Sequence, residues 1–190
     1  MTWRLYPPRY GAMSTNTTSI EAYTDGSCLK NPGKGGWAYL YNIEAQKTST
    51  TYYNYGAKAN TTNNEMELTA FLKLLKDLLN FKGTRKFHVI IHCDSQYVLK
   101  SFVKLNTRGV GHIRKEKDID GWYVTGKPKK NLKILKQIYN LLVKYILSGN
   151  ELTLKWVKGH AGDEFNEIVD KLARRAAEGP TSKIVLKKYP

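Results

Sequence analysis

The sequence predicts a single α/β domain in which a mixed β-sheet carries helices on both of its faces. Two observations lead to this fold class. Three strand-like segments follow one another directly, which predicts an antiparallel meander, and helical and strand-like patterns then alternate, which predicts parallel strands. A chain of 190 residues is long enough for one domain with a sizeable core.

Five segments have the composition of β-strands. The first three are rich in aromatic and β-branched residues, and turn residues between positions 31 and 36 separate the first from the second. The fourth is mostly apolar, as is typical of a central parallel strand that is buried on both faces. The expected strands are Glu21–Ser27, Trp37–Ile43, Thr50–Tyr55, Phe87–Cys93 and Leu152–Trp156.

Four segments have helical periodicity. In the first, leucines occupy positions 68, 72, 75 and 79, while positions 69, 73, 76 and 80 are polar, which separates an apolar face from a polar one. A glycine at position 149 closes the third. The expected helices are Asn63–Asn80, Ser95–Lys104, Leu132–Leu147 and Asp163–Ala177.

The other segments flank or interrupt the domain. We expect residues 1–19 to form a flexible, irregular arm, because they are rich in proline, serine, threonine and asparagine. Residues 20–179 form the folded domain, and residues 180–190 form a short basic tail. Within the domain, residues 105–130 have no clear period and are rich in charge and glycine. We refer to residues 105–130 as the handle.

The charge of the chain indicates a polyanionic partner. There are 31 Lys and Arg against 16 Asp and Glu, and the net charge is +15. Such an excess favours nucleic acid first and an anionic membrane surface second. No apolar run is long enough to span a bilayer, and the N-terminus lacks the apolar core of a signal peptide.

The cysteine content bears on the cellular compartment. Cys28 and Cys93 are the two cysteines, so we expect free thiols in a reducing compartment, which predicts a cytoplasmic protein. Residues 1–19 contain Arg4 and Arg9 and no acid, so organelle targeting through this segment is the alternative.

Four carboxylates stand out in this basic chain: Asp25, Glu67, Asp94 and Asp170. Two follow or end predicted strands, and two lie on predicted helices at or beside the apolar face. Acids gathered in a protein interior usually need a divalent metal ion to neutralise their repulsion. Each acid also has a plainer interpretation. Asp25 can be a turn residue, and Glu67 can be a first-turn residue that complements the helix dipole. Asp94 can be an N-cap, and Asp170 can be a solvated helix residue.

His160 lies in a loop between the last predicted strand and the last helix, with glycines on both sides. A histidine near metal-binding acids is suited to proton transfer at neutral pH, although a lone histidine in a loop is more often a surface residue. Two Mg²⁺ ions held by the acids, with Mn²⁺ as an alternative, can activate a water and stabilise the leaving oxygen in a phosphoryl displacement.

Four motifs in the expected order resemble ribonuclease H of type 1, over about residues 21–178. They are long and specific, and they surround Asp25, Glu67, Asp94 and His160: Thr24 to Gly33, Thr61 to Leu68, Cys93 to Val98, and Trp156 to Gly162 followed by Asn166, Glu167 and Asp170. The resemblance implies a ribonuclease H-like fold with a five-stranded mixed sheet, in which strands one to three are antiparallel and strands four and five are parallel to strand one.

The resemblance also implies an activity and a set of site residues. The activity is endonucleolytic hydrolysis of the RNA strand of an RNA–DNA hybrid by a two-metal mechanism, performed by a monomer. Asp25, Glu67, Asp94 and Asp170 would bind the metals, and His160 would be the proton shuttle. Residues matching minor-groove contacts are Cys28, Asn31, Asn63, Asn64 and Gln96. Residues matching contacts to the DNA strand are Thr62, Trp122 and Asn131, and Lys127, Lys129 and Lys130 of the handle add positive charge.

Two departures from the family pattern affect the predicted grip on phosphate. Glu65 stands where an arginine is frequent, and Asn60 stands where another basic residue is expected. The handle is longer than usual, but residues 100–136 still hold eleven basic residues against three acids. The positive charge of the handle is therefore kept, while its shape is not predicted.

Three other functions compete with hydrolysis of a hybrid. A proofreading-type exonuclease on a related fold would carry two acids one residue apart on the first strand, whereas Asp25 is followed by Gly26 and Ser27. A non-catalytic hybrid-binding module is the usual result when one acid is lost, but all four acids and His160 are present. A third alternative is a ribonuclease H domain excised from a reverse transcriptase. The sequence leaves this alternative open, although the handle favours independent substrate binding.

Overall fold

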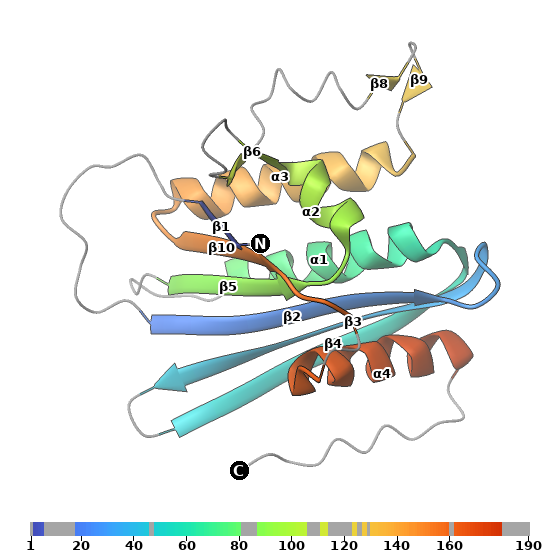
Figure 1. The fold of residues 1–190 in the computed structure, drawn as a ribbon, viewed down its shortest axis with the longest axis horizontal. Helices are drawn as coiled ribbons and strands as arrows, with labels where there is room; N and C mark the ends of the chain where they lie inside the picture. Colours follow the sequence, from blue (N-terminus) through green and yellow to red (C-terminus); the bar gives the residue numbers. More distant parts are fainter. Residues whose placement is uncertain are drawn as a thin grey trace.

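A six-stranded mixed sheet in the order β1-β10-β5-β2-β3-β4 forms the centre of the structure (Figure 1). The structure is a computed structural model, and it describes residues 2–5, 18–45, 48–80, 87–105, 111–113, 123–124, 127–128, 130–159 and 162–179. The antiparallel meander consists of β2 (Thr18–Cys28), β3 (Gly33–Ala45) and β4 (Thr48–Thr61). Next to it, β5 (Phe87–Cys93) runs parallel to β2, and β10 (Glu151–Trp156) runs parallel to β5. The five predicted strands and their directions are confirmed.

The sixth strand was not predicted. Strand β1 (Thr2–Leu5) pairs antiparallel with β10, and Thr18 and Ser19 belong to β2. The irregular conformation predicted for residues 1–19 is therefore wrong for these six residues. The physical reason is that β10 would otherwise be a sheet edge with unpaired backbone N–H and C=O groups, which β1 satisfies. Residues 6–17 lie outside the described residues.

Helices cover both faces of the sheet, as predicted (Figure 1). Helices α1 (Asn63–Leu79), α2 (Gln96–Phe102) and α3 (Leu132–Leu147) contribute to the larger core, which also takes apolar side chains from β2, β5 and β10. Helix α4 (Glu164–Glu178) packs on the opposite face against Tyr23, Ala38 and Leu40. The alternation of side chains along β2 supplies both cores, with Ala22 on one face and Tyr23 on the other.

The helices that approach the strand ends begin with side-chain caps. The Thr62 hydroxyl accepts a hydrogen bond from the Glu65 N–H, the Ser95 hydroxyl accepts one from the Val98 N–H, and the Asp163 carboxylate accepts one from the Asn166 N–H. These caps fix where α1, α2 and α4 start, and the starts of all three lie near the predicted site residues.

Most of the described residues of the handle, together with Val103 and Lys104 before it, lie in short strands. Strand β6 (Val103–Leu105) pairs with β7 (Gly111–Ile113), and β8 (Tyr123–Val124) pairs with β9 (Lys127–Pro128). Among the described helices, none is both long and apolar enough to cross a membrane.

Candidate active site

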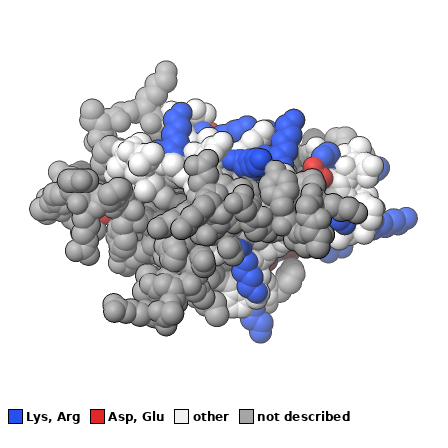
Figure 2. All heavy atoms as spheres, turned by 90° about the horizontal axis from the view of Figure 1, so that it is seen from above, with Lys and Arg blue, Asp and Glu red and all other residues white. Residues whose placement is uncertain are grey.

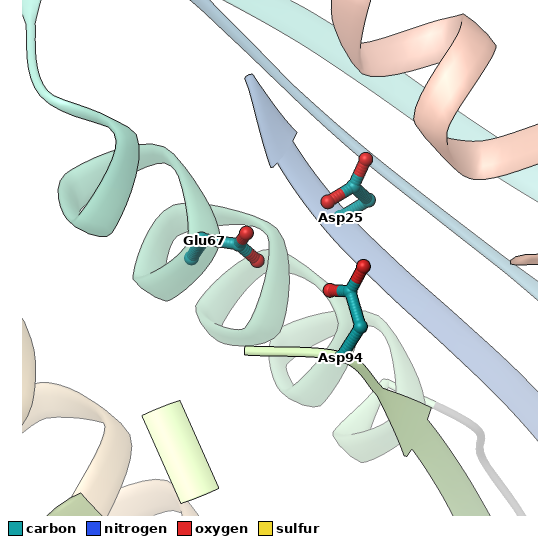
Figure 3. Close-up of side chains that lie close together, drawn as sticks. All are labelled: Asp25, Glu67 and Asp94. Carbon is teal, nitrogen blue, oxygen red and sulfur yellow. The ribbon is translucent and has the colours of Figure 1, made fainter. Parts of the chain in front are cut away.

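Three carboxylates meet where the parallel strands β2 and β5 end. Asp25 lies on β2, and Asp94 directly follows β5, whose last residue, Cys93, is the register partner of Thr24. Glu67 reaches them from α1. One oxygen from each carboxylate lies within 4.8 Å of the others (Figure 3). Adjacent parallel strands place their ends at the same edge, which explains why residues so far apart in sequence converge.

Two glycines allow the helices to come close enough for this convergence. At Gly26, an added Cβ would lie 2.7 Å from the Glu67 Cα and closer still to the Glu67 backbone nitrogen. The backbone of α1 therefore lies directly on β2, and Glu67 is placed beside Asp25. Gly36 on β3 does the same for α4, because an added Cβ would lie 2.6 Å from the Ala177 backbone nitrogen.

Asp170 of α4 joins the group from the other face of the sheet. It shares a side-chain hydrogen bond with Asp25, and it raises the pKa of Asp25 through its charge as well as through this bond. The structure thus brings together all four acids predicted from the sequence.

Burial and mutual repulsion raise the pKa values of two acids of the site, Asp25 and Glu67. The pKa of Asp25 lies well above its usual value, first because of burial and then because of the charges of Asp94 and Asp170. A hydrogen bond of 2.8 Å from the Gly26 N–H to Asp25 Oδ1 acts in the opposite direction. The pKa of Glu67 is also raised, by burial first and by the charges of Asp25 and Asp94 next.

The donor set fits a divalent metal ion. Asp25 and Glu67 are each only 6% exposed, and Glu67 Oε2 is buried without a hydrogen-bond partner among the described residues. A buried carboxylate oxygen without a partner is costly, and a hard cation with a preference for oxygen ligands would satisfy it. Asp25, Glu67 and Asp94 could hold such an ion, with Asp170 beside them.

The plainer interpretations of Asp94 and Glu67 do not describe their positions. The cap of α2 is the Ser95 hydroxyl, so the Asp94 side chain is not the N-cap. Glu67 is buried, whereas an exposed position is typical of a glutamate that only complements the helix dipole.

The segment after β10 is held against Asp94. Trp156 Nε1 donates to the Asp94 carbonyl at 3.1 Å, and the Val157 N–H donates to the Cys93 carbonyl at 3.2 Å. A Cβ added at Gly159 would lie 2.9 Å from Asp94 Oδ2. His160 itself lies outside the described residues, but its neighbour Gly159 packs on an acid of the group.

Comparison with known proteins agrees with this arrangement of helices and strands. The RNase H family model matches residues 17–178. The chain belongs to the ribonuclease H family. It is 36% identical over 162 residues to ribonuclease H of Albidiferax ferrireducens, which covers 84% of this chain and 95% of that protein. It is 37% identical over 160 residues to ribonuclease H of Xanthomonas campestris, which covers 84% and 92%.

Solved structures of ribonucleases H share the fold. LC9-RNase H1, a type 1 RNase H with the type 2 active-site motif, has a TM-score of 0.66 at 23% identity, covering 87% of this chain and 75% of that one. LC11-RNase H1, solved in complex with an RNA/DNA hybrid, has a TM-score of 0.56 at 20% identity, covering 84% and 96%.

The ribonuclease H resemblance also predicted substrate contacts, and several of these residues lie together. The Asn63 N–H donates to Asn31 Oδ1 at 3.0 Å, and the Cys28 thiol donates to the Thr61 carbonyl at 3.4 Å. Thr62 caps α1 beside them, and Asn64 is exposed on its first turn. The turn after β2 and the start of α1 therefore form one surface next to Glu67.

The remaining predicted contacts lie on other elements. Gln96 is exposed at the start of α2, and its Oε1 accepts from Lys100 Nζ at 2.8 Å. Asn131 precedes α3 in the left-handed conformation, next to exposed Lys130. Lys127 belongs to β9, and its side chain is not described. Trp122 and Lys129 lie outside the described residues.

Sequence reasoning missed a compensation at Glu65. Lys58 of β4 forms an ion pair of 2.5 Å with Glu65 Oε1, and the Thr61 hydroxyl donates to Glu65 Oε2 at 2.7 Å. Burial alone would raise the pKa of Glu65, but the hydrogen bonds from Lys58 and Thr61 outweigh this effect. The pKa of Glu65 is therefore lowered. A cation thus reaches the position where the sequence places a negative charge. Sequence spacing carries no signal for this pairing, because the two residues are on different elements.

Proposed function

We propose that this chain is a metal-dependent endoribonuclease that hydrolyses the RNA strand of RNA–DNA hybrids. The observation that carries the proposal is the buried group formed by Asp25, Glu67 and Asp94, which Asp170 joins through its hydrogen bond to Asp25. Membership of the ribonuclease H family supports the reaction class, and the hybrid bound by LC11-RNase H1 supports the substrate.

The four acids would hold two Mg²⁺ ions, or Mn²⁺ in their place. When bound, such ions supply an activated water and stabilise the leaving oxygen of the phosphodiester. Asp25 and Glu67 provide buried carboxylates on rigid elements, and Asp94 and Asp170 complete the group from a strand end and from α4. His160 would take up and release a proton; its neighbour Gly159 lies against Asp94, which supports this role.

Substrate binding would combine short polar contacts with a basic surface. Cys28, Asn31, Asn63, Asn64 and Gln96 would contact the minor groove, where the 2′-hydroxyls of RNA are accessible. Thr62, Trp122 and Asn131 would contact the DNA strand. On the face seen in Figure 2, Lys and Arg predominate over Asp and Glu among the described residues. Lys127, Lys129 and Lys130 would add contacts to phosphates.

We also propose that the protein works as a monomer in the cytoplasm. Cys28 and Cys93 are both free thiols, which supports a reducing compartment.

The proposal is tested by cleavage of an RNA–DNA hybrid whose RNA strand carries a 5′ label. We expect internal cuts in Mg²⁺, no cuts in EDTA, and restored cutting when Mg²⁺ is returned. The same RNA alone and the same sequence as duplex DNA are the matched controls. A protein that cuts single-stranded RNA as fast as the hybrid, or that binds the hybrid and never cuts it in Mg²⁺ or Mn²⁺, contradicts the proposal.

A further inference from the structure

Asn166 on α4 is a buried amide whose side-chain oxygen has no partner among the described residues. The residue is 4% exposed, and its carbonyl oxygen Oδ1 has no hydrogen-bond partner within the described part of the chain. Its backbone N–H donates to the Asp163 carboxylate at 3.2 Å, so the missing partner concerns the side-chain oxygen and not the backbone N–H. A buried acceptor without a partner destabilises the folded protein. An apolar residue of similar size would avoid this cost.

The position of Asn166 relates it to the acids. It lies four residues before Asp170 on α4, and residues at this spacing lie on one face of a helix with their Cβ atoms roughly 5–6 Å apart. Asp170 shares a hydrogen bond with Asp25, and further along the same face Ala173 and Ala177 lie against Gly36. Asn166 is therefore the next residue on the face of α4 that is turned toward the carboxylates.

An unpaired acceptor beside a metal site has a natural partner. Mg²⁺ bound by a few carboxylates keeps several water molecules, and the charge of the ion makes these waters strong hydrogen-bond donors. An amide oxygen accepts from such a water without adding a further negative charge to a site that already holds four acids. Partners of this kind orient the groups around a metal, and their loss typically weakens metal binding about 10- to 100-fold.

We propose that Asn166 is a positioning residue whose Oδ1 accepts a hydrogen bond from a water in the hydration shell of the divalent ion held near Asp170. This inference rests on the proposed function, because it needs the metal site. It predicts that Asn166 affects metal affinity even when no substrate is present.

The experiment is a calorimetric titration of the full chain with Mg²⁺ alone, combined with thermal unfolding in EDTA. Asn166→Leu removes the unpaired oxygen, so the metal-free protein gains thermal stability while Mg²⁺ affinity falls about 10-fold or more. Asn166→Asp keeps an acceptor at the same place and retains Mg²⁺ affinity at least equal to that of the unchanged protein.

A matched control separates this role from the removal of any buried polar group. Tyr145 of α3 is 1% exposed, and in the described structure its hydroxyl also lacks a partner. Tyr145→Phe removes that hydroxyl on a helix outside the carboxylate group. It should stabilise the metal-free protein and leave Mg²⁺ affinity unchanged.

Asp94→Asn distinguishes failure of this inference from failure of the metal site. If Asp94→Asn weakens Mg²⁺ binding and Asn166→Leu does not, the role of Asn166 is overturned and the metal site stands. If the Asn166→Asp protein binds Mg²⁺ as weakly as the Asn166→Leu protein, the positioning role of Asn166 is also overturned. If neither Asp94→Asn nor Asn166→Leu changes Mg²⁺ binding, the metal site itself fails, and the inference fails with it.

Discussion

Replacing Gly26 by alanine should impair catalysis through backbone packing, without removing any polar group. The added Cβ would lie 2.7 Å from the Glu67 Cα and closer still to the Glu67 backbone nitrogen. An ordinary contact begins near 3.4 Å, so α1 and β2 must separate by more than about 0.7 Å. Overpacking of this kind typically costs about 1–3 kcal/mol of unfolding free energy. In a chain of this size, that corresponds to a fall in Tm of roughly 2–12 °C.

The displacement falls on Glu67, so we expect the cleavage rate to fall as well as the stability. A misplacement of about 1 Å at an active site can cost on the order of 10²-fold. We therefore expect Gly26→Ala to lower the single-turnover cleavage rate by about 10- to 100-fold while the protein remains folded at 25 °C. The assay is rapid-quench cleavage of a labelled hybrid at saturating Mg²⁺, with circular dichroism to verify folding.

Gly56→Ala is the matched control for this prediction. A Cβ at Gly56 would lie 2.7 Å from the Trp37 ring, so it also overpacks the sheet, but it meets an aromatic side chain and not the backbone that carries Glu67. We expect it to lower Tm and to leave the cleavage rate within about twofold of the unchanged protein. A folded Gly26→Ala protein with an unchanged single-turnover rate would refute the idea that this close approach positions Glu67.

Four further predictions follow from the site. Asp94→Asn should abolish cleavage yet preserve hybrid binding in a gel-shift assay, because it removes charge and keeps shape; loss of binding in a folded protein would contradict this division of roles. In EDTA, the folded-state pKa values of Asp25 and Glu67 lie above their unfolded values, so stability should fall as pH rises from the unfolded toward the folded values. Thermal unfolding at several pH values should show Mg²⁺ reducing that fall, and a fall of equal size with and without Mg²⁺ would count against metal binding by these acids. His160→Ala should slow single turnover by about 10²-fold, and an unchanged rate would exclude proton transfer by this residue. Finally, replacing Lys127, Lys129 and Lys130 by glutamine should make the log–log salt slope of hybrid binding shallower by about one to three units. Deletion of residues 1–16 is the control, and it should change the slope much less.

The strands could be predicted from the sequence wherever burial leaves a hydrophobic pattern in the residues. The fourth predicted strand matches β5 in both bounds, since it is covered on both faces and is apolar almost throughout. The third was expected to end at Tyr55, yet β4 continues to Thr61. Nearly all residues of β4 are exposed, so no hydrophobic pattern marks where this edge strand ends.

At the N-terminus, the strands could not be predicted from the sequence because they depend on pairing with residues far along the chain. Thr18 and Ser19 join β2 by pairing with Phe87 and His88, and β1 exists because β10 offers an open edge. Neither segment has a local pattern that indicates a strand. Their conformation follows from backbone hydrogen bonds to distant residues, which spacing along the chain does not encode.

The acids of the site also divide into placements that follow from local patterns and details that do not. Strand order alone brings Asp25 and Asp94 together, and helical periodicity turns Glu67 inward, so these placements could be predicted from the residues. The capping role could not, because aspartate and serine are both good N-caps and only the structure shows that Ser95 takes that role beside Asp94.

Lys58 and Glu65 show how a departure from a family pattern can mislead when residues are considered singly. A glutamate in place of an arginine lowers the expected attraction for phosphate at the start of α1. In the structure, both oxygens of Glu65 are occupied, one by Lys58 and one by the Thr61 hydroxyl, and Lys58 keeps half of its side-chain surface exposed at 51%. A neutralised carboxylate repels phosphate much less than a free one, since the ammonium lies 2.5 Å away. The charge at this point is therefore a property of the pair, and because β4 and α1 meet only in the folded chain, it becomes visible only when their packing is known.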